Sequence, residues 1–195
     1  MAKRKTTAMT FPVKAHLRER NSGTKVPATV RPMSEPDLAQ WSRWAYGGDD
    51  QDKAWEWDKI LKESERGRTE SYALYADERL QGLACLDTKG HATASGKALV
   101  VDYIASRPVN RRGNGGFKDV GTALIAIAIH RSRELGWAGR LWLESLPGAA
   151  EVYTHLGFTK LDGRSKDGYM MFELSEENAN QLFDLARTKN IVSLS

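Results

Sequence analysis

The segment NRRGNGGFKDVGTALIAIAIH, residues 110–130, places glycines and basic side chains directly before an apolar run. A loop of this kind could hold a phosphate, because the first turn of a helix offers unpaired backbone N–H groups and the positive end of the helix dipole. Two registers remain, NRRGNG at 110–115 and KDVGTA at 118–123. We favour the second, because it adjoins the helix and Gly121 has no side chain to obstruct a phosphate. Residues 111–116 would then be an inserted flap. The alternative is a helix start that only packs and binds nothing.

Two acidic residues in apolar surroundings indicate proton transfer. Asp102 lies within ALVVDYIAS, and Glu144 lies within RLWLESL. Burial of a carboxylate costs free energy, so Asp102 needs a reason for its place. A general base and a salt-bridge partner both remain open for Asp102, and Glu144 is the second candidate base.

The remaining reactive side chains favour packing over chemistry. His130 and His155 lie on expected helices without the spacing of metal ligands, so no metal site is expected. The single cysteine, Cys85, lies in the apolar stretch LQGLACL, which excludes a disulfide framework and indicates a structural role. A reducing, cytoplasmic setting fits this cysteine content best.

The charge of the chain is unevenly distributed. The formal net charge of the 195 residues is +4, but residues 1–25 contain seven basic side chains and one acidic side chain, so the remainder is mildly acidic. We expect residues 1–25 to be a disordered basic tail, and attraction of nucleic acid by that tail is the alternative. The longest apolar run, residues 123–129, is too short to cross a bilayer, so no membrane partner is expected.

Apolar periodicity and turn residues predict the elements that position these side chains. Strands are expected at 25–33, 71–77, 80–88, 98–106, 140–146 and 167–174, and helices at 34–47, 49–67, 121–135, 148–158 and 175–190. Ser34 and Ser175 are the expected N-caps of two helices, and residues 89–97 are an expected loop. This order predicts a mixed sheet with helices on both faces, in a domain at 26–175 followed by a C-terminal helix and tail at 176–195.

Three motifs together resemble one family, the GCN5-related N-acetyltransferases (GNAT). The family's loop of Arg or Gln, two residues, Gly, one residue and Gly or Ala is similar to KDVGTA at 118–123. A second family mark is similar to YTHLGF at 153–158, and TVRPMSEPDLAQW at 29–41 looks like the family's first strand and helix. The resemblance runs from about residue 28 to 174. Lys118 in place of Arg or Gln, the long loop after Pro108, and Leu146-Pro147 in place of an Asn depart from the pattern.

The resemblance implies a mixed α+β fold in the broad α/β class. Its central sheet would be mostly antiparallel, flanked by helices and splayed between the fourth and fifth expected strands. It also implies transfer of an acetyl group from acetyl-CoA to a primary amine by direct attack. Tyr153 would reprotonate the leaving thiolate, and Asp102 would be the base. The residues implied to bind the cofactor are Ile104, Ala105, Ser106, Lys118, Asp119, Val120, Gly121, Thr122 and Ala123.

The acceptor and partners stay open at the level of sequence. Tryptophans and acids at 41–58 could form a rim for a cationic amine, or an amphipathic helix pair with buried tryptophans. The acceptor would then be a small-molecule or peptide amine. The alternative function is an RNA- or ribosome-associated protein, including a toxin-like member that acetylates aminoacyl-tRNA, with the tail and Arg111-Arg112 gripping phosphates. A homodimer is compatible with either function.

Overall fold

The computed structural model describes residues 11–48, 50–111 and 115–193. The strands are β1 (Val13–Glu19), β2 (Lys25–Pro32), β3 (Glu70–Ala76), β4 (Arg79–Thr93), β5 (Gly96–Ser106), β6 (Phe117–Lys118), β7 (Leu141–Ser145), β8 (Thr159–Lys160), β9 (Met170–Leu174) and β10 (Val192–Ser193). The α-helices are α1 (Glu35–Trp41), α2 (Trp57–Glu65), α3 (Val120–Glu134), α4 (Ala150–His155) and α5 (Glu176–Thr188). Short 3-10 helices are η1 (Gln51–Ala54), η2 (Pro108–Asn110) and η3 (Pro147–Ala149).

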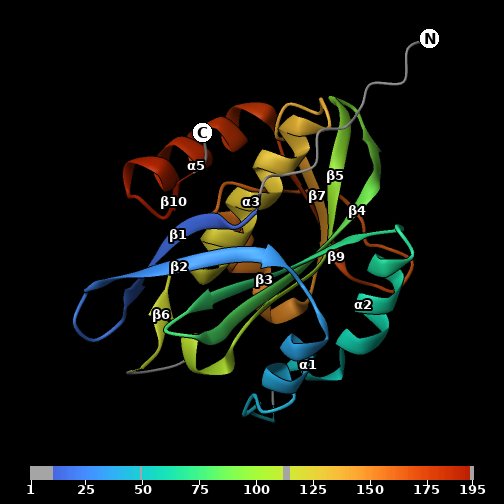
Figure 1. Ribbon diagram of the computed structural model, residues 1–195. Helices are drawn as coiled ribbons and strands as arrows, with labels where there is room; N and C mark the ends of the chain where they lie inside the picture. Colours follow the sequence, from blue (N-terminus) through green and yellow to red (C-terminus); the bar gives the residue numbers. More distant parts are fainter. Residues whose placement is uncertain (1–10, 49, 112–114, 194–195) are drawn as a thin grey trace.

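The strands form one mixed sheet in the order β10-β1-β2-β3-β4-β5-β7-β9-β8, with β6 paired to β1. All pairings are antiparallel except that of β5 with β7. In Figure 1, α1 and α2 lie on one side of the sheet and α3 and α5 on the other. The expected fold class is therefore confirmed, and the expected elements follow in the expected order, but β1 and the short strands β6, β8 and β10 were not expected. No helix in the described part of the chain is long and apolar enough to span a membrane.

Alternating side chains of the strands divide the core in two. Ala73, Leu83 and Cys85 pack against α2, where Trp57 is fully buried. The intervening residues of the same strands face α3, which is buried between the sheet and α5 and is therefore apolar on all sides from residue 123 to residue 129. The approach of α3 is so close that a side chain at Gly82 would meet Val120 at 2.8 Å.

The tail and boundary predictions need correction. Residues 13–19, expected to be disordered, form β1, because Val13, Ala15 and Leu17 alternate and are buried. The clustered positive charge concealed this period of two, which is that of a half-buried strand. Residues 1–10 lie outside the described residues. The C-terminal helix is not a separate appendage, since α5 packs on α3 and buries Phe183.

Several expected boundaries also differ. Residues 89–97 are not a loop, since β4 and β5 continue through most of them as a hairpin. The expected helix at 49–67 is the 3-10 helix η1 followed by α2. Ser175 caps α5 as expected, accepting a hydrogen bond from the Asn178 N–H at 3.2 Å.

An inserted loop joins β5 to α3 and crosses the end of the sheet. Its β6 residues pair with β1, and the Arg20 N–H donates to the Gly116 carbonyl. Asn110 fixes the loop from within: its side-chain amide donates to the Gln81 carbonyl, and its Oδ1 accepts from the Phe117 N–H at 2.8 Å. A side chain at Gly116 would lie 2.3 Å from the Asn110 oxygen, so only glycine fits there.

Candidate active site

The parallel strands β5 and β7 separate almost as soon as they meet. They pair only at Leu99 with Leu141 and Val100 with Trp142, although β5 continues to Ser106. The expected splay between the fourth and fifth strands is thereby confirmed. Past this point no strand in the described chain pairs with the β7-facing edge of β5, which includes the predicted segment from Ile104 to Ser106. Main-chain groups on such an edge are available to an extended ligand.

A β-bulge marks the point of separation. Cys85 pairs with Tyr103 and Leu86 with Val101, so Asp102 is an extra residue on β5. In a regular strand neighbouring side chains face opposite sides of the sheet. Here Asp102 and Tyr103 line the same cavity, because the bulge redirects one of them.

The first turn of α3 lies at the end of the inserted loop. Its first intrahelical bond runs from the Ala123 N–H to the Asp119 carbonyl, so the N–H groups of Val120, Gly121 and Thr122 have no acceptor within the helix. A Cβ at Gly121 would meet no atom within 4 Å. These observations fit the phosphate seat predicted at 118–123. The alternative register at 110–115 includes residues 112–114, which lie outside the described residues.

The residues just before α3 alter the charge of this seat. Asp119 has a left-handed backbone with φ 72°, and its carboxylate lies 3.1 Å from the Arg18 guanidinium. A carboxylate at this position would repel a phosphate, and Arg18 offsets that charge. Lys118 is exposed on β6 and adds a further positive charge. Sequence reasoning missed Arg18, because it had been assigned to the tail.

A cavity of about 460 Å³ lies between α2 and the bulge. Its walls include Trp55 from the segment before α2, Cys85 and Asp87 from β4, and Asp102 and Tyr103 from β5. The Trp55 and Tyr103 rings meet edge to face with centroids 5.2 Å apart. The cavity is therefore aromatic on one side, and its other walls carry acids together with Lys59, Arg68 and Lys89, of which Lys59 is paired with Glu56 and Arg68 with Glu63.

Asp102 is the carboxylate most altered by this environment. Its side chain is exposed at the cavity, although its neighbours in the sequence are apolar, and the surrounding protein still displaces part of its water. Desolvation, followed by repulsion from Asp87 and Glu144, raises the pKa of Asp102 to about 6. None of these three carboxylates has an ion pair with any described residue. The salt-bridge explanation for Asp102 is therefore not supported, and the general-base explanation remains.

Tyr153 lies on α4 with its ring in the core. The ring packs against Phe158 and Phe172 at centroid distances of 5.6 and 5.8 Å, and burial raises the pKa of Tyr153 to about 12. No described residue forms a hydrogen bond with the Tyr153 hydroxyl, and the protein does not fully enclose the hydroxyl oxygen. The hydroxyl is thus free to meet a ligand, but it is a weaker acid than an exposed tyrosine.

Arg111 ties the inserted loop to the segment between α1 and α2. Its guanidinium lies 2.7 Å from one oxygen of Asp52, contacts the other, and also reaches Asp50 and the Ser106 carbonyl. Both acids are buried. Arg111 is therefore not available to bind RNA phosphates, as the alternative function predicted. Arg112, the second arginine of that prediction, lies outside the described residues.

The acidic and aromatic segment at 41–58 mostly serves structure. Trp44 and Trp57 are buried, which supports the amphipathic interpretation over the open rim. Asp49 lies outside the described residues. Trp55 and Glu56 do line the cavity, but Glu56 is paired with Lys59.

The other candidate residues take no part in the cavity. His130 stacks near Phe183 and lies 3.5 Å from Glu134, and His155 contacts the Glu151 carbonyl on the surface of α4. Within the described ranges, no group of three potential metal-binding side chains occurs.

Comparisons with known proteins establish the fold. A scan against models of protein families gives no match, and a search of curated proteins gives none either. Among solved structures, a mutant AtaT toxin bound to the C-terminus of the antitoxin AtaR and acetyl-CoA has a TM-score of 0.60 at 16% identity, covering 80% of this chain and 98% of that chain. The GNAT domain of S. lividans PAT has a TM-score of 0.58 at 20% identity, covering 83% and 96%. The ribosomal-protein-S18-alanine N-acetyltransferase from Escherichia coli has a TM-score of 0.50 at 20% identity, covering 75% and 92%. The chain therefore has the GNAT fold.

The Arg111 contacts generate a prediction about stability. Arg111→Gln should lower the free energy of unfolding by about 3 kcal/mol, because it leaves Asp52 buried without its charge partner. Urea unfolding followed by circular dichroism measures this change. Arg43→Gln, at an exposed site where the side chain has no hydrogen bond or ion pair with a described residue, is the control and should change stability by less than about 0.5 kcal/mol. A loss below about 1 kcal/mol for Arg111→Gln would mean that the pair behaves as an exposed ion pair.

Proposed function

We propose that this protein is an acetyl-CoA-dependent N-acetyltransferase that acts on a primary amine. The observation that carries the proposal is the unpaired edge of β5 beside the open first turn of α3. An extended arm and a diphosphate need these two features side by side. The GNAT fold and the acetyl-CoA in the AtaT structure support the same conclusion.

The cofactor would supply the acetyl thioester, and the chain would bind it largely through main-chain groups. The N–H groups of Val120, Gly121 and Thr122 would donate to the diphosphate, with Lys118 adding charge nearby. The β5 edge at Ile104 and Ala105 would pair with the pantetheine arm, and a backbone N–H there would stabilise the developing oxyanion. The Ser106 carbonyl already accepts from Arg111, so Ser106 would contribute less than expected.

Asp102 would take the proton of the attacking amine. With a pKa of about 6 it is ionised at neutral pH, yet it is a stronger base than an ordinary aspartate. Its position at the bulge places the carboxylate in the cavity, beside the point where β5 and β7 separate. No nucleophile of the enzyme is required, and burial raises the pKa of the Cys85 thiol, which keeps it un-ionised.

We propose that the acceptor is cationic before it loses its proton. Asp87 and Glu144 repel the charge of Asp102, and none of the three has an ion pair with a described residue, so an ammonium group beside Asp102 would be attracted. The rings of Trp55 and Tyr103 add a cation–π surface at the same cavity.

Gly121→Val should weaken acetyl-CoA binding at least tenfold, because the added side chain would occupy the phosphate seat. The fold should tolerate it, since the space beside Gly121 is open. Calorimetric titration with acetyl-CoA measures the effect. Gly115→Ala is the matched control from the other register; a larger loss there than in Gly121→Val would assign the seat to 110–115.

Asp102→Asn should lower turnover about 10²-fold near pH 8. In the native enzyme, turnover should rise with pH through about 6, because only the ionised carboxylate accepts a proton. The variant should lose this limb in a pH profile at saturating substrates. Asp87→Asn should instead move the limb to lower pH, because removal of a neighbouring negative charge lowers the pKa of Asp102. A limb that persists in Asp102→Asn would belong to the acceptor amine.

Tyr153→Phe should lower turnover by about 10²-fold with little change in acetyl-CoA affinity. We expect this low end of the range because complete proton transfer from the Tyr153 hydroxyl, of pKa about 12, to a thiolate whose thiol has a pKa of about 8.5 costs about 5 kcal/mol. Steady-state kinetics alongside the calorimetry separates the two parameters. Unchanged turnover would remove Tyr153 from the acid role.

A further inference from the structure

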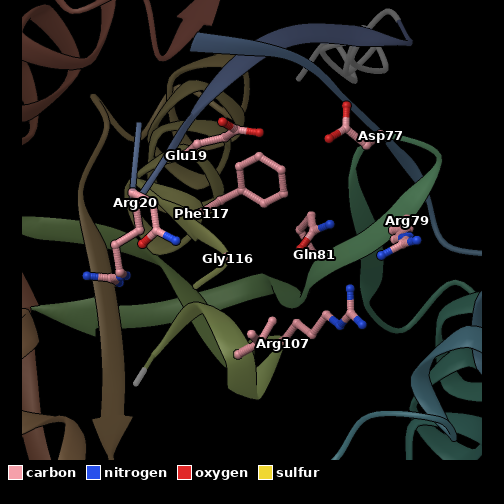
Figure 2. A pocket seen from close by; sticks show the side chains of 10 residues that line it. Glu19, Arg20, Asp77, Arg79, Gln81, Arg107, Gly116 and Phe117 are labelled. Atoms are coloured by element: carbon pink, nitrogen blue, oxygen red, sulfur yellow. The ribbon is translucent and has the colours of Figure 1, made fainter. Parts of the chain in front are cut away.

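A second cavity, of about 530 Å³, lies at the end of the sheet where β5 gives way to the inserted loop (Figure 2). It shares no lining residue with the cavity at Asp102. Arg107, on its wall, follows Tyr103 by four residues, which corresponds to about 13 Å along an extended strand. It is therefore a separate site, and the acetyl transfer proposed above makes no use of it.

The walls of this cavity are held in place by the fold. One wall is the end of β1 with β6 paired against it, and this wall carries Glu19 and Phe117. Another is the turn between β3 and β4, where Asp77 and Glu78 both adopt positive φ, 49° and 59°. Aspartate tolerates this backbone in a two-residue hairpin turn, whereas glutamate does so at a local cost in free energy, and the turn fixes the place of Asp77.

Opposite charges stand apart across the cavity. In Figure 2 the Glu19 and Asp77 carboxylates both lie in the upper part of the view, whereas the Arg107 side chain lies at the bottom. Arg79 lines the cavity at its side, and Arg20 turns away to donate to the Asn110 carbonyl.

Neither pair of charges is neutralised. The side chains of Arg79 and Arg107 have no hydrogen bond or ion pair with any residue that the structure describes, and neither has the Asp77 side chain; Arg107 is bonded only through its backbone, to Gln81 and Asn110. Glu19 accepts a hydrogen bond from the Ser22 hydroxyl but has no cationic partner in the described ranges. Separated charges of opposite sign give the cavity a polar axis, which favours a ligand with a cation at one end and an anion at the other.

Part of the cavity wall is apolar. Phe117 is 9% exposed, and in Figure 2 its ring lies below Glu19, with Gln81 between the ring and Arg107. Val109 also lines the cavity and is among the exposed large apolar side chains of the described residues. An apolar side chain of the ligand would gain from contact with both.

We propose that this cavity binds a zwitterion of the amino-acid class, either a free amino acid or a short peptide, with an apolar side chain. The ammonium lies between Glu19 and Asp77, the carboxylate binds Arg107 and Arg79, and the side chain packs on Phe117. A ligand that carries only one of the two charges loses the ion pairs at one end of the cavity.

The test is calorimetric titration of the full chain, without acetyl-CoA, with three matched probes. L-Leucine should bind at least tenfold more tightly than N-acetyl-L-leucine, which lacks the ammonium, and L-leucinamide, which lacks the carboxylate. Similar affinities for all three probes, or no saturable binding of L-leucine at millimolar concentration, would overturn the proposal. A tighter interaction with leucyl-glycyl-glycine assigns a peptide ligand, and an equal or weaker one assigns the free amino acid.

Variants should respond according to the charge they remove. In Glu19→Gln, L-leucine should bind no better than N-acetyl-L-leucine, and in Arg107→Gln no better than L-leucinamide. Arg79→Gln, at an exposed position, repeats the second test with less risk to folding, and circular dichroism checks each variant. Arg187→Gln, exposed on α5, is the control and should bind as the native chain does. If charge removal at Glu19 or Arg107 leaves the preference for L-leucine intact, the assignment is wrong.

The result is separable from the acetyltransferase proposal. Gly121→Val, designed to block acetyl-CoA, should bind L-leucine normally. Loss of L-leucine binding in that variant would place the amino-acid site at α3 and contradict the assignment to this cavity.

Discussion

The parallel pairing of β5 with β7 stops after two residue pairs, and the proposed chemistry depends on that interruption. A sheet normally satisfies the N–H and C=O groups of an internal strand on both sides. Here the extra residue at Asp102 disturbs the register of β5 at the point of separation. The bulge therefore lies beside the free main-chain edge of β5 and directs the Asp102 carboxylate toward the cavity. The proposed cofactor binding and the proposed proton transfer both depend on this one irregularity.

The inserted loop connects this irregularity to the rest of the molecule. One part of it pairs with β1 through β6, another is fixed to Gln81 through Asn110, and a third is tied to Asp52 through Arg111. It is thus a structural element and not the free flap that its glycines suggest. Because it leads directly into α3, these contacts also set the position of the first turn, where the phosphate seat is proposed.

Charge is arranged differently at the two cavities. At Asp102 three carboxylates lie near one another without a cationic partner among the described residues, which raises a pKa and would attract an ammonium group. At the end of the sheet, carboxylates and guanidiniums face each other across open space. Neither arrangement stabilises the fold by itself, since unpaired charges gain little from the protein around them. Both are better explained by ligands than by stability.

The sequence by itself determined the order of the main elements, the caps, and the helix start at Gly121, because these depend on periodicity and on residues close together in the chain. It also singled out Asp102. It missed β1, since clustered charge hid the alternation of Val13, Ala15 and Leu17. Only the tertiary structure decided that Arg111 forms an ion pair with Asp52, 59 residues away, and that Arg18 forms one with Asp119. Such pairs, like the bulge, arise from how distant strands meet, and no local pattern encodes that meeting.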